Sequence, residues 1–126
     1  MSSAQPEMNP HRFAAWCALS ELFLDTALDD ADIAVIARQL SATGIALPEL
    51  ERIYEDEVAP VCWRNLRAPA GAAWSAFDRS WLVTEIERRR SLSVLDRVPF
   101  LHRLRIRRWT RDSREDWLRV QRLLAD

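Results

Sequence analysis

The residues that most often carry chemistry in proteins are few and widely spaced in this chain. The two histidines are His11 and His102, and the two cysteines, Cys17 and Cys62, are separated by 45 positions. No Cys-x-x-Cys, His-Glu-x-x-His or Gly-x-Ser-x-Gly motif occurs, so a zinc site or a nucleophilic hydrolase has no local signature. Both cysteines lie in apolar stretches, which predicts buried, reduced and unreactive thiols. A Cys/His dyad assembled in space stays open, but it would need an exposed, activated thiol. We therefore predict no enzyme activity, no catalytic residue, no metal site and no cofactor.

Carboxylates form two groups in the first half of the chain. Glu51 and Glu55 are one helical turn apart, as in a pair for general acid–base catalysis, but no predicted cleft or metal ligand accompanies them. The acidic groups could instead imitate phosphate towards a basic partner and steer its approach, or they could cap helices and line a solvated face. As candidate partner-binding residues of this kind we take Asp29, Asp30, Glu51, Glu55 and Asp56.

The basic residues are all arginines, because the chain contains no lysine. One series follows the C-terminal part and comprises Arg103, Arg105, Arg107, Arg108, Arg111 and Arg114. Interleaved with Trp109, it could track a nucleic-acid backbone. It could also pair internally with the acids of the first half, or be solvated. The net charge of −1 argues against strong nonspecific binding to phosphate, so nucleic acid is the less favoured partner.

Six tryptophans among 126 residues suit either a core or an interface, since indole rings anchor both. Three of them lie in apolar contexts and are predicted to be core residues: Trp16, Trp74 and Trp81. Trp63 and Trp109 have arginine neighbours and are the better candidates for the surface, although Arg stacking on Trp is also a common contact inside proteins. With Arg105 and Arg108 they complete the candidate partner-binding residues.

Charge is distributed unevenly between the two halves. Residues 1–63 hold 3 Arg against 11 acidic residues, net −8, whereas residues 64–126 hold 15 Arg against 8 acidic residues, net +7. Such asymmetry predicts either a charged partner or two halves that pack together and neutralise each other. Only two glycines are present, which excludes a glycine-rich phosphate loop or a dinucleotide fingerprint.

The size of the chain, 14.6 kDa, fits one domain. No apolar run is long enough to span a bilayer, and the N-terminus lacks the features of a secretory signal, so we expect a cytoplasmic protein with no membrane partner. We expect a disordered tail at 1–8 and a single helical domain at 9–126, arginine-rich from about residue 88.

Helix signals then place the elements. Asn9 and Pro10 begin a helix to about Leu24 that is apolar on nearly all sides and so predicted to be buried. Asp29 begins a second helix that Gly44 ends. A third helix begins at Pro48. It places Glu57 inward, where we expect Asn65 or Arg64 as its partner, and it kinks or breaks at Pro60.

The rest of the chain is also predicted to be helical. Residues 67–76 form the longest loop, and Asp78 then caps a helix onto which Phe77 packs. Residues 100–109 alternate like a strand, but no second strand exists to pair with them, so we predict a helix. A last helix begins near Ser113. The fold class is all-α, a compact bundle of five or six helices around a buried N-terminal helix.

Three blocks carry a resemblance to a known family: Leu19–Thr26 (LSELFLDT), Glu57–Val61 with Asn65–Leu66, and Trp74–Leu82 (WSAFDRSWL). In this order they resemble a family of small, uncharacterised proteobacterial proteins, over about Phe13 to Glu87. The chain departs from it before the Phe-Asp pair, where Gly71–Trp74 replaces an expected Ala-Gly-Glu-Trp.

The resemblance implies no activity. In size and class such proteins are similar to immunity proteins. We therefore expect a bacterial immunity protein that binds a cognate secreted or contact-delivered toxin and neutralises it by direct contact. The alternative is an arginine-rich nucleic-acid-binding or regulatory adaptor protein.

Overall fold

The computed structural model describes residues 9–24, 27–67, 77–92 and 99–125. Seven α-helices lie within these residues: α1 Pro10–Ser20, α2 Asp30–Ala42, α3 Leu47–Ile53, α4 Ala59–Cys62, α5 Arg79–Leu92, α6 Pro99–Thr110 and α7 Arg114–Ala125. Short 3₁₀ turns cover Glu21–Phe23 and Trp63–Arg67, and a π-helical turn covers Tyr54–Val58. The described residues form no strand, which confirms the all-α prediction and the helix at 100–109. The expected tail at 1–8, the loop at 68–76 and Trp74 lie outside the described residues.

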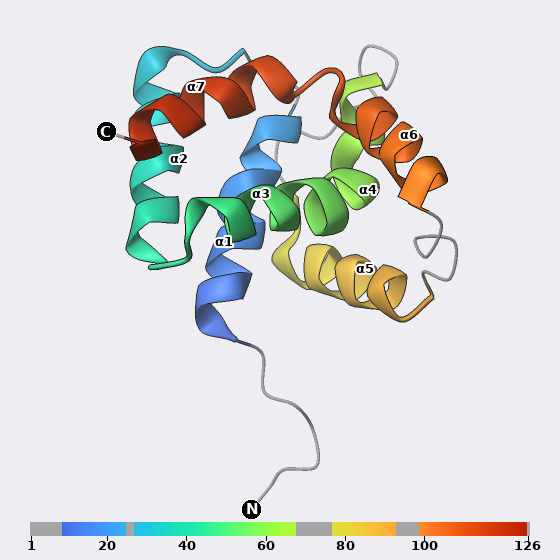
Figure 1. The fold of residues 1–126 in the computed structure, drawn as a ribbon. Helices are drawn as coiled ribbons and strands as arrows, with labels where there is room; N and C mark the ends of the chain where they lie inside the picture. Colours follow the sequence, from blue (N-terminus) through green and yellow to red (C-terminus); the bar gives the residue numbers. More distant parts are fainter. Residues whose placement is uncertain (1–8, 25–26, 68–76, 93–98, 126) are drawn as a thin grey trace, which may run out of the picture.

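The helices pack around α1, as predicted. α1 contacts α2, α3, α5 and the π-helical turn (Figure 1). α7 lies against α2 along one edge of the molecule, and α5 and α6 contact α4 at the other end. Because the segment from α3 to Arg67 is one continuous helical path, the described chain forms six helical units, in agreement with the predicted five or six.

Local signals determine where α1 and α2 begin and end. The Asn9 side chain accepts hydrogen bonds from the backbone N–H groups of His11 and Arg12, and α1 tightens into the 3₁₀ turn after Ser20. At α2, the side chains of Asp29 and Asp32 each accept from the other residue's backbone, which is the predicted capping box. Gly44 follows α2 with a φ of 72°, the left-handed conformation predicted for it.

The segment from Leu47 to Arg67 bends rather than breaks at Pro60. Ala59 donates its backbone N–H to the carbonyl of Tyr54, five residues earlier, so the turn before the proline is wider than an α-turn. That extra width lies where the Pro60 ring would crowd the preceding turn of a regular helix. The path changes direction between α3 and α4 (Figure 1), so the predicted kink is present while helical hydrogen bonding continues.

Aromatic contacts attach α7 to this bent segment. Tyr54 stacks on Trp117 with ring centroids 4.9 Å apart and also contacts Phe23. The hydroxyls of Tyr54 and Ser113 are hydrogen-bonded at 2.6 Å. Since these rings are fully buried, α7 belongs to the core and is not an appended tail.

Candidate functional site

Most of the predicted acidic surface is engaged in contacts inside the molecule. The guanidinium of Arg114 in α7 donates to Glu55 at 3.1 Å and to Glu51 at 3.3 Å. His102 Nε2 of α6 lies 2.9 Å from an Asp56 carboxylate oxygen. Arg119 donates to Asp30 at 2.7 Å. Four of the five candidate acids therefore hold α6 and α7 onto the first half of the chain.

The fifth candidate, Asp29, caps α2 and is exposed. Burial raises the pKa of Glu55, the neighbouring Glu51 raises it further, and Arg114 offsets part of this effect. The pair one turn apart thus binds an arginine. Asp29 and Asp30, at the start of α2, remain exposed to solvent.

Glu57 is buried, as predicted, but the predicted partners were wrong. Arg12 binds the carboxylate through two guanidinium nitrogens, with Nε 3.0 Å from Oε1, and the Trp16 indole N–H donates to the same oxygen at 2.7 Å. Asn65 instead donates to the Phe23 carbonyl at 2.8 Å. Glu57 turns to α1 because of the tertiary packing of the bent segment, and a partner 45 residues away has no local signal.

Trp63 and Trp109 differ in exposure. The prediction that Trp109 lies at the surface is wrong: it is 9% exposed, and the Arg89 guanidinium lies 4.7 Å from its ring centroid. Trp63 is half-buried, and two exposed guanidiniums stand near its ring, Arg64 at 5.5 Å and Arg108 at 5.2 Å. The arginine beside Trp109 comes from α5, so the neighbours of this indole in sequence were a misleading guide to its exposure.

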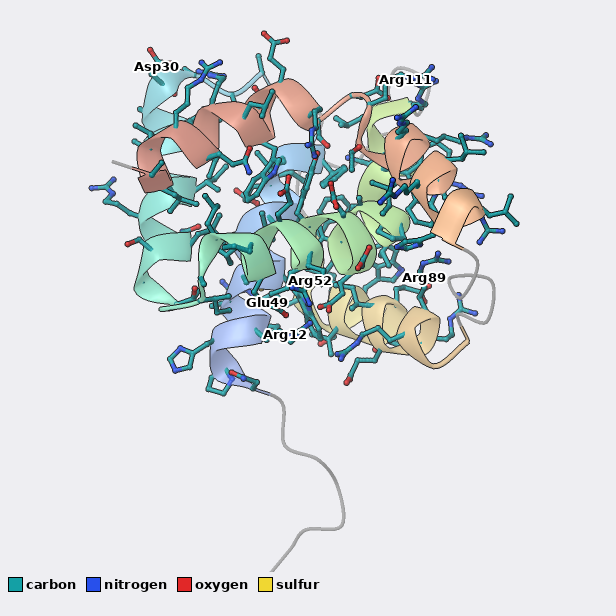
Figure 2. The ribbon with its side chains drawn as sticks, viewed as in Figure 1. Arg12, Asp30, Glu49, Arg52, Arg89 and Arg111 are labelled. Atoms are coloured by element: carbon teal, nitrogen blue, oxygen red, sulfur yellow. The ribbon has the colours of Figure 1, made fainter. Side chains whose placement is uncertain are left out.

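The side of α6 opposite Trp109 faces solvent and carries positive charge without ion pairs among the described residues. Leu101 and Leu104 are 43% and 47% exposed, and Arg107, Arg108 and Arg111 are exposed beside them. We call these five residues, of which Arg111 directly follows the helix, the α6 face. No Asp or Glu occurs between residues 99 and 111. Figure 2 places Arg111 at the outer margin of the molecule, away from the crowded junction of Arg12 and Glu49.

The arginine series divides in two. Arg114 points inward to the carboxylates of α3 and the π-helical turn. Among the ion pairs of the described residues, none involves Arg103, Arg105, Arg107 or Arg111, and Asp112 pairs with Arg67 instead. Arg105 lies half-buried at the flank of the α6 face. The two exposed leucines were not predicted from sequence, because helical spacing places them outward only once Trp109 is known to be buried.

A hollow of about 490 Å³ lies between α1, α2 and α5 and is the place where catalysis would be sought. Cys17 lines it, half-buried rather than buried as predicted, because the surrounding residues Ala14, Ala18 and Ala42 are small. Burial raises the pKa of the Cys17 thiol, and the charge of Arg79 offsets this only in part. A thiol in this state is protonated at neutral pH and is a poor nucleophile. Neither histidine lines the hollow.

Cys62 is buried, and burial raises its thiol pKa strongly. No cluster of His, Cys, Asp and Glu suited to a metal ion occurs in the described parts of the chain. The same residues contain no helix with the length and apolar character that crossing a bilayer requires.

The chain matches a family of proteins. No curated protein and no solved structure matches the chain. A family model matches residues 10–123, which is nearly the whole chain and includes α6 and most of α7. The chain therefore belongs to the family described as domain of unknown function DUF7079.

Proposed function

We propose that this domain acts by binding a protein, as an immunity protein that neutralises a toxin by direct contact. The observation that carries the proposal is the α6 face, where exposed leucines and arginines lie together with no acid in the helix to compensate them. Glu51, Glu55 and Asp30 are bound by arginines of α7. Among the described residues, no ion pair neutralises Arg107, Arg108 or Arg111, so the α6 face is positive. The expected partner surface is accordingly acidic.

Two features favour a protein partner over nucleic acid. Leu101 and Leu104 are exposed on the same side of α6 as the arginines, and an apolar centre with a charged margin is typical of protein interfaces. The indoles that could stack on bases are already engaged: Trp109 is buried and Trp63 has two guanidiniums beside it.

Binding is favoured over catalysis by the state of three groups, one carboxylate and two thiols. Glu57, the most buried carboxylate described, has three donors, and Cys17 and Cys62 both have raised thiol pKa values. A catalytic group needs an accessible reactive form at the working pH.

Co-expression with the candidate toxin encoded beside this gene tests the proposal. We expect cells to survive only when this protein is present, and we expect both chains to co-elute on gel filtration. Survival without a complex would contradict direct neutralisation, and no survival would contradict the function itself.

Nucleic-acid binding is the second candidate, supported by the same unpaired arginines. It requires affinity for a short DNA or RNA duplex that falls steeply as salt is raised, because each phosphate contact releases counterions. A titration of the purified protein with such a duplex at two salt concentrations decides between the candidates.

A further inference from the structure

The exposed side of α6 has the spacing of a helix-packing seam. Leu101, Leu104 and Arg108 follow one another at intervals of three and four residues, the pattern of successive inward positions in a coiled coil. Arg111, the first residue after α6, follows three residues later. The residues of α6 that lie against the rest of the domain are on the opposite side, including the buried Trp109 and Thr110. This seam therefore belongs to no packing interface within the described residues.

The positions that flank a seam select the partner by charge. On α6 they are Arg105 and Arg107, and the seam itself ends in Arg108 and Arg111. Carboxylates at the facing positions of a second helix would pair with them, whereas lysines or arginines there would be repelled. The leucines occupy the N-terminal half of the seam and need an apolar neighbour.

We propose that the α6 face receives an acidic amphipathic helix of the partner protein. Apolar residues of that helix pack on Leu101 and Leu104, and its carboxylates bind Arg107, Arg108 and Arg111. Trp63 orients one of these cations, because the Arg108 guanidinium lies 5.2 Å from its ring centroid. Arg64, next to the same ring, extends the positive surface beyond α6. This proposal rests on the proposed function and specifies the kind of partner surface.

Synthetic peptides of about three heptads test the proposal, since shorter helices are marginal in water. The probe carries Leu at the seam positions and Glu at the flanking positions. A second peptide has Lys in place of Glu, and a third has the composition of the probe in scrambled order. Isothermal titration calorimetry with the full chain measures the affinity of each. We expect only the ordered acidic peptide to bind.

Variants on α6 and α7 locate the binding surface. Leu104→Ser and Arg111→Glu should each weaken binding of the acidic peptide by about tenfold or more, the size of effect expected for a central interface contact. Leu123→Ser and Arg122→Glu are matched controls on α7, where Leu123 is 46% exposed against 47% for Leu104. The controls should bind as the wild type does, and thermal melts check that all four variants are folded.

Several results would overturn the proposal. Equal binding of the scrambled peptide would show that charge alone is recognised, and equal loss in the α7 controls would place the contact elsewhere. Duplex DNA that binds more tightly than the peptide and loses affinity in Arg111→Glu would make nucleic acid the occupant. Self-association that Leu104→Ser abolishes would make a second copy of this chain the occupant.

The same variants separate this proposal from the proposed function. Full toxin neutralisation by Leu104→Ser and Arg111→Glu would leave the immunity function intact and contradict the assigned surface. A domain that binds the acidic peptide through α6 but protects no cell would support the assigned surface and contradict the immunity function.

Discussion

Glu57 shows how a single buried charge is stabilised by groups distant in sequence. Its carboxylate accepts from Arg12 through two nitrogens and from the Trp16 indole, all on α1. The hydrogen bond with Glu57 is the largest cause of the raised pKa of Arg12, and burial opposes it. A charged group held by three donors contributes to stability mainly because its removal leaves those donors unsatisfied.

Glu57→Ala should destabilise the fold by about 2 to 3 kcal/mol, because Arg12 and the Trp16 N–H lose their shared acceptor. Glu49→Ala is the matched control: Glu49 also binds Arg12, at 3.4 Å, but it is more exposed. The control should cost less than about 1 kcal/mol. Urea unfolding measures both values, and equal losses would contradict the central role given to Glu57.

Tyr54 makes the stability of the fold depend on pH in the alkaline range. Burial raises the pKa of its phenol to about 12, and the hydrogen bond with Ser113 lowers it in part. The unfolded phenol titrates near 10, so between about pH 10 and 12 the folded state holds the proton that the unfolded state releases. Stability due to this group is therefore present below pH 10 and is lost as the pH rises towards 12.

Tyr54→Phe should cost about 1 kcal/mol at neutral pH through the lost hydrogen bond, and it should flatten the fall in stability between about pH 10 and 12. Thermal melts over this range give the comparison. A residual fall from Cys62 remains in both proteins, since its thiol pKa is raised as well. An unchanged alkaline slope would contradict the assignment to Tyr54.

At the scale of elements, helix ends could be predicted from sequence and contacts between helices could not. Asn9, Asp29 and Gly44 act on backbone groups within four residues, so their effects are encoded locally. The partners of Glu57 and the exposure of Trp109 depend on how distant helices pack, and the arginine that covers Trp109 comes from α5. In the candidate site, the arginines were identified from sequence. The exposure of the leucines beside them can be predicted only when the side of α6 that packs against the domain is known.

Asp78 is a test of one such local prediction. Its side chain accepts from the backbone N–H of Trp81 at 3.0 Å, and its carbonyl accepts from Leu82 at 2.9 Å. Asp78→Ala should destabilise the protein by about 1 kcal/mol through the lost cap, whereas Asp78→Asn keeps an acceptor and should lose little. Thermal melts that are equal for wild type and the alanine variant would show that this end of α5 is not held by the cap.

For the molecule as a whole, the two oppositely charged halves attach to each other. Arg114 binds Glu51 and Glu55, Arg119 binds Asp30, and His102 binds Asp56, so arginine-rich helices dock on acidic ones. The sequence left open whether the uneven distribution of charge serves to bind a partner or to hold the two halves together. The inner sides of α6 and α7 form the interface with the acidic half, and the arginines without an ion pair remain on the α6 face.

Added salt should change the stability of the wild type and of Arg114→Gln in different directions. In the wild type, salt screens the attraction between Arg114 and the two carboxylates, so stability falls towards about 1 M NaCl. Without Arg114, Glu51 and Glu55 repel each other one turn apart, and screening relieves that repulsion. Stability of the variant should stay level or rise with salt, as measured by thermal melts. If the stability of wild type and variant fell in parallel with salt, Arg114 would not hold the two halves together by charge.

The widened turn before Pro60 makes the length of this segment a constraint in its own right. The turn holds one residue more than an α-turn, so a chain one residue shorter between Tyr54 and Val58 would close it to an α-turn, with the Pro60 ring against the carbonyl four residues before it. The buried Ala59 and Cys62 follow directly, so the clash would fall within the core. Tyr54, Glu57 and Val58 of this turn are buried, so both its residues and its length are constrained.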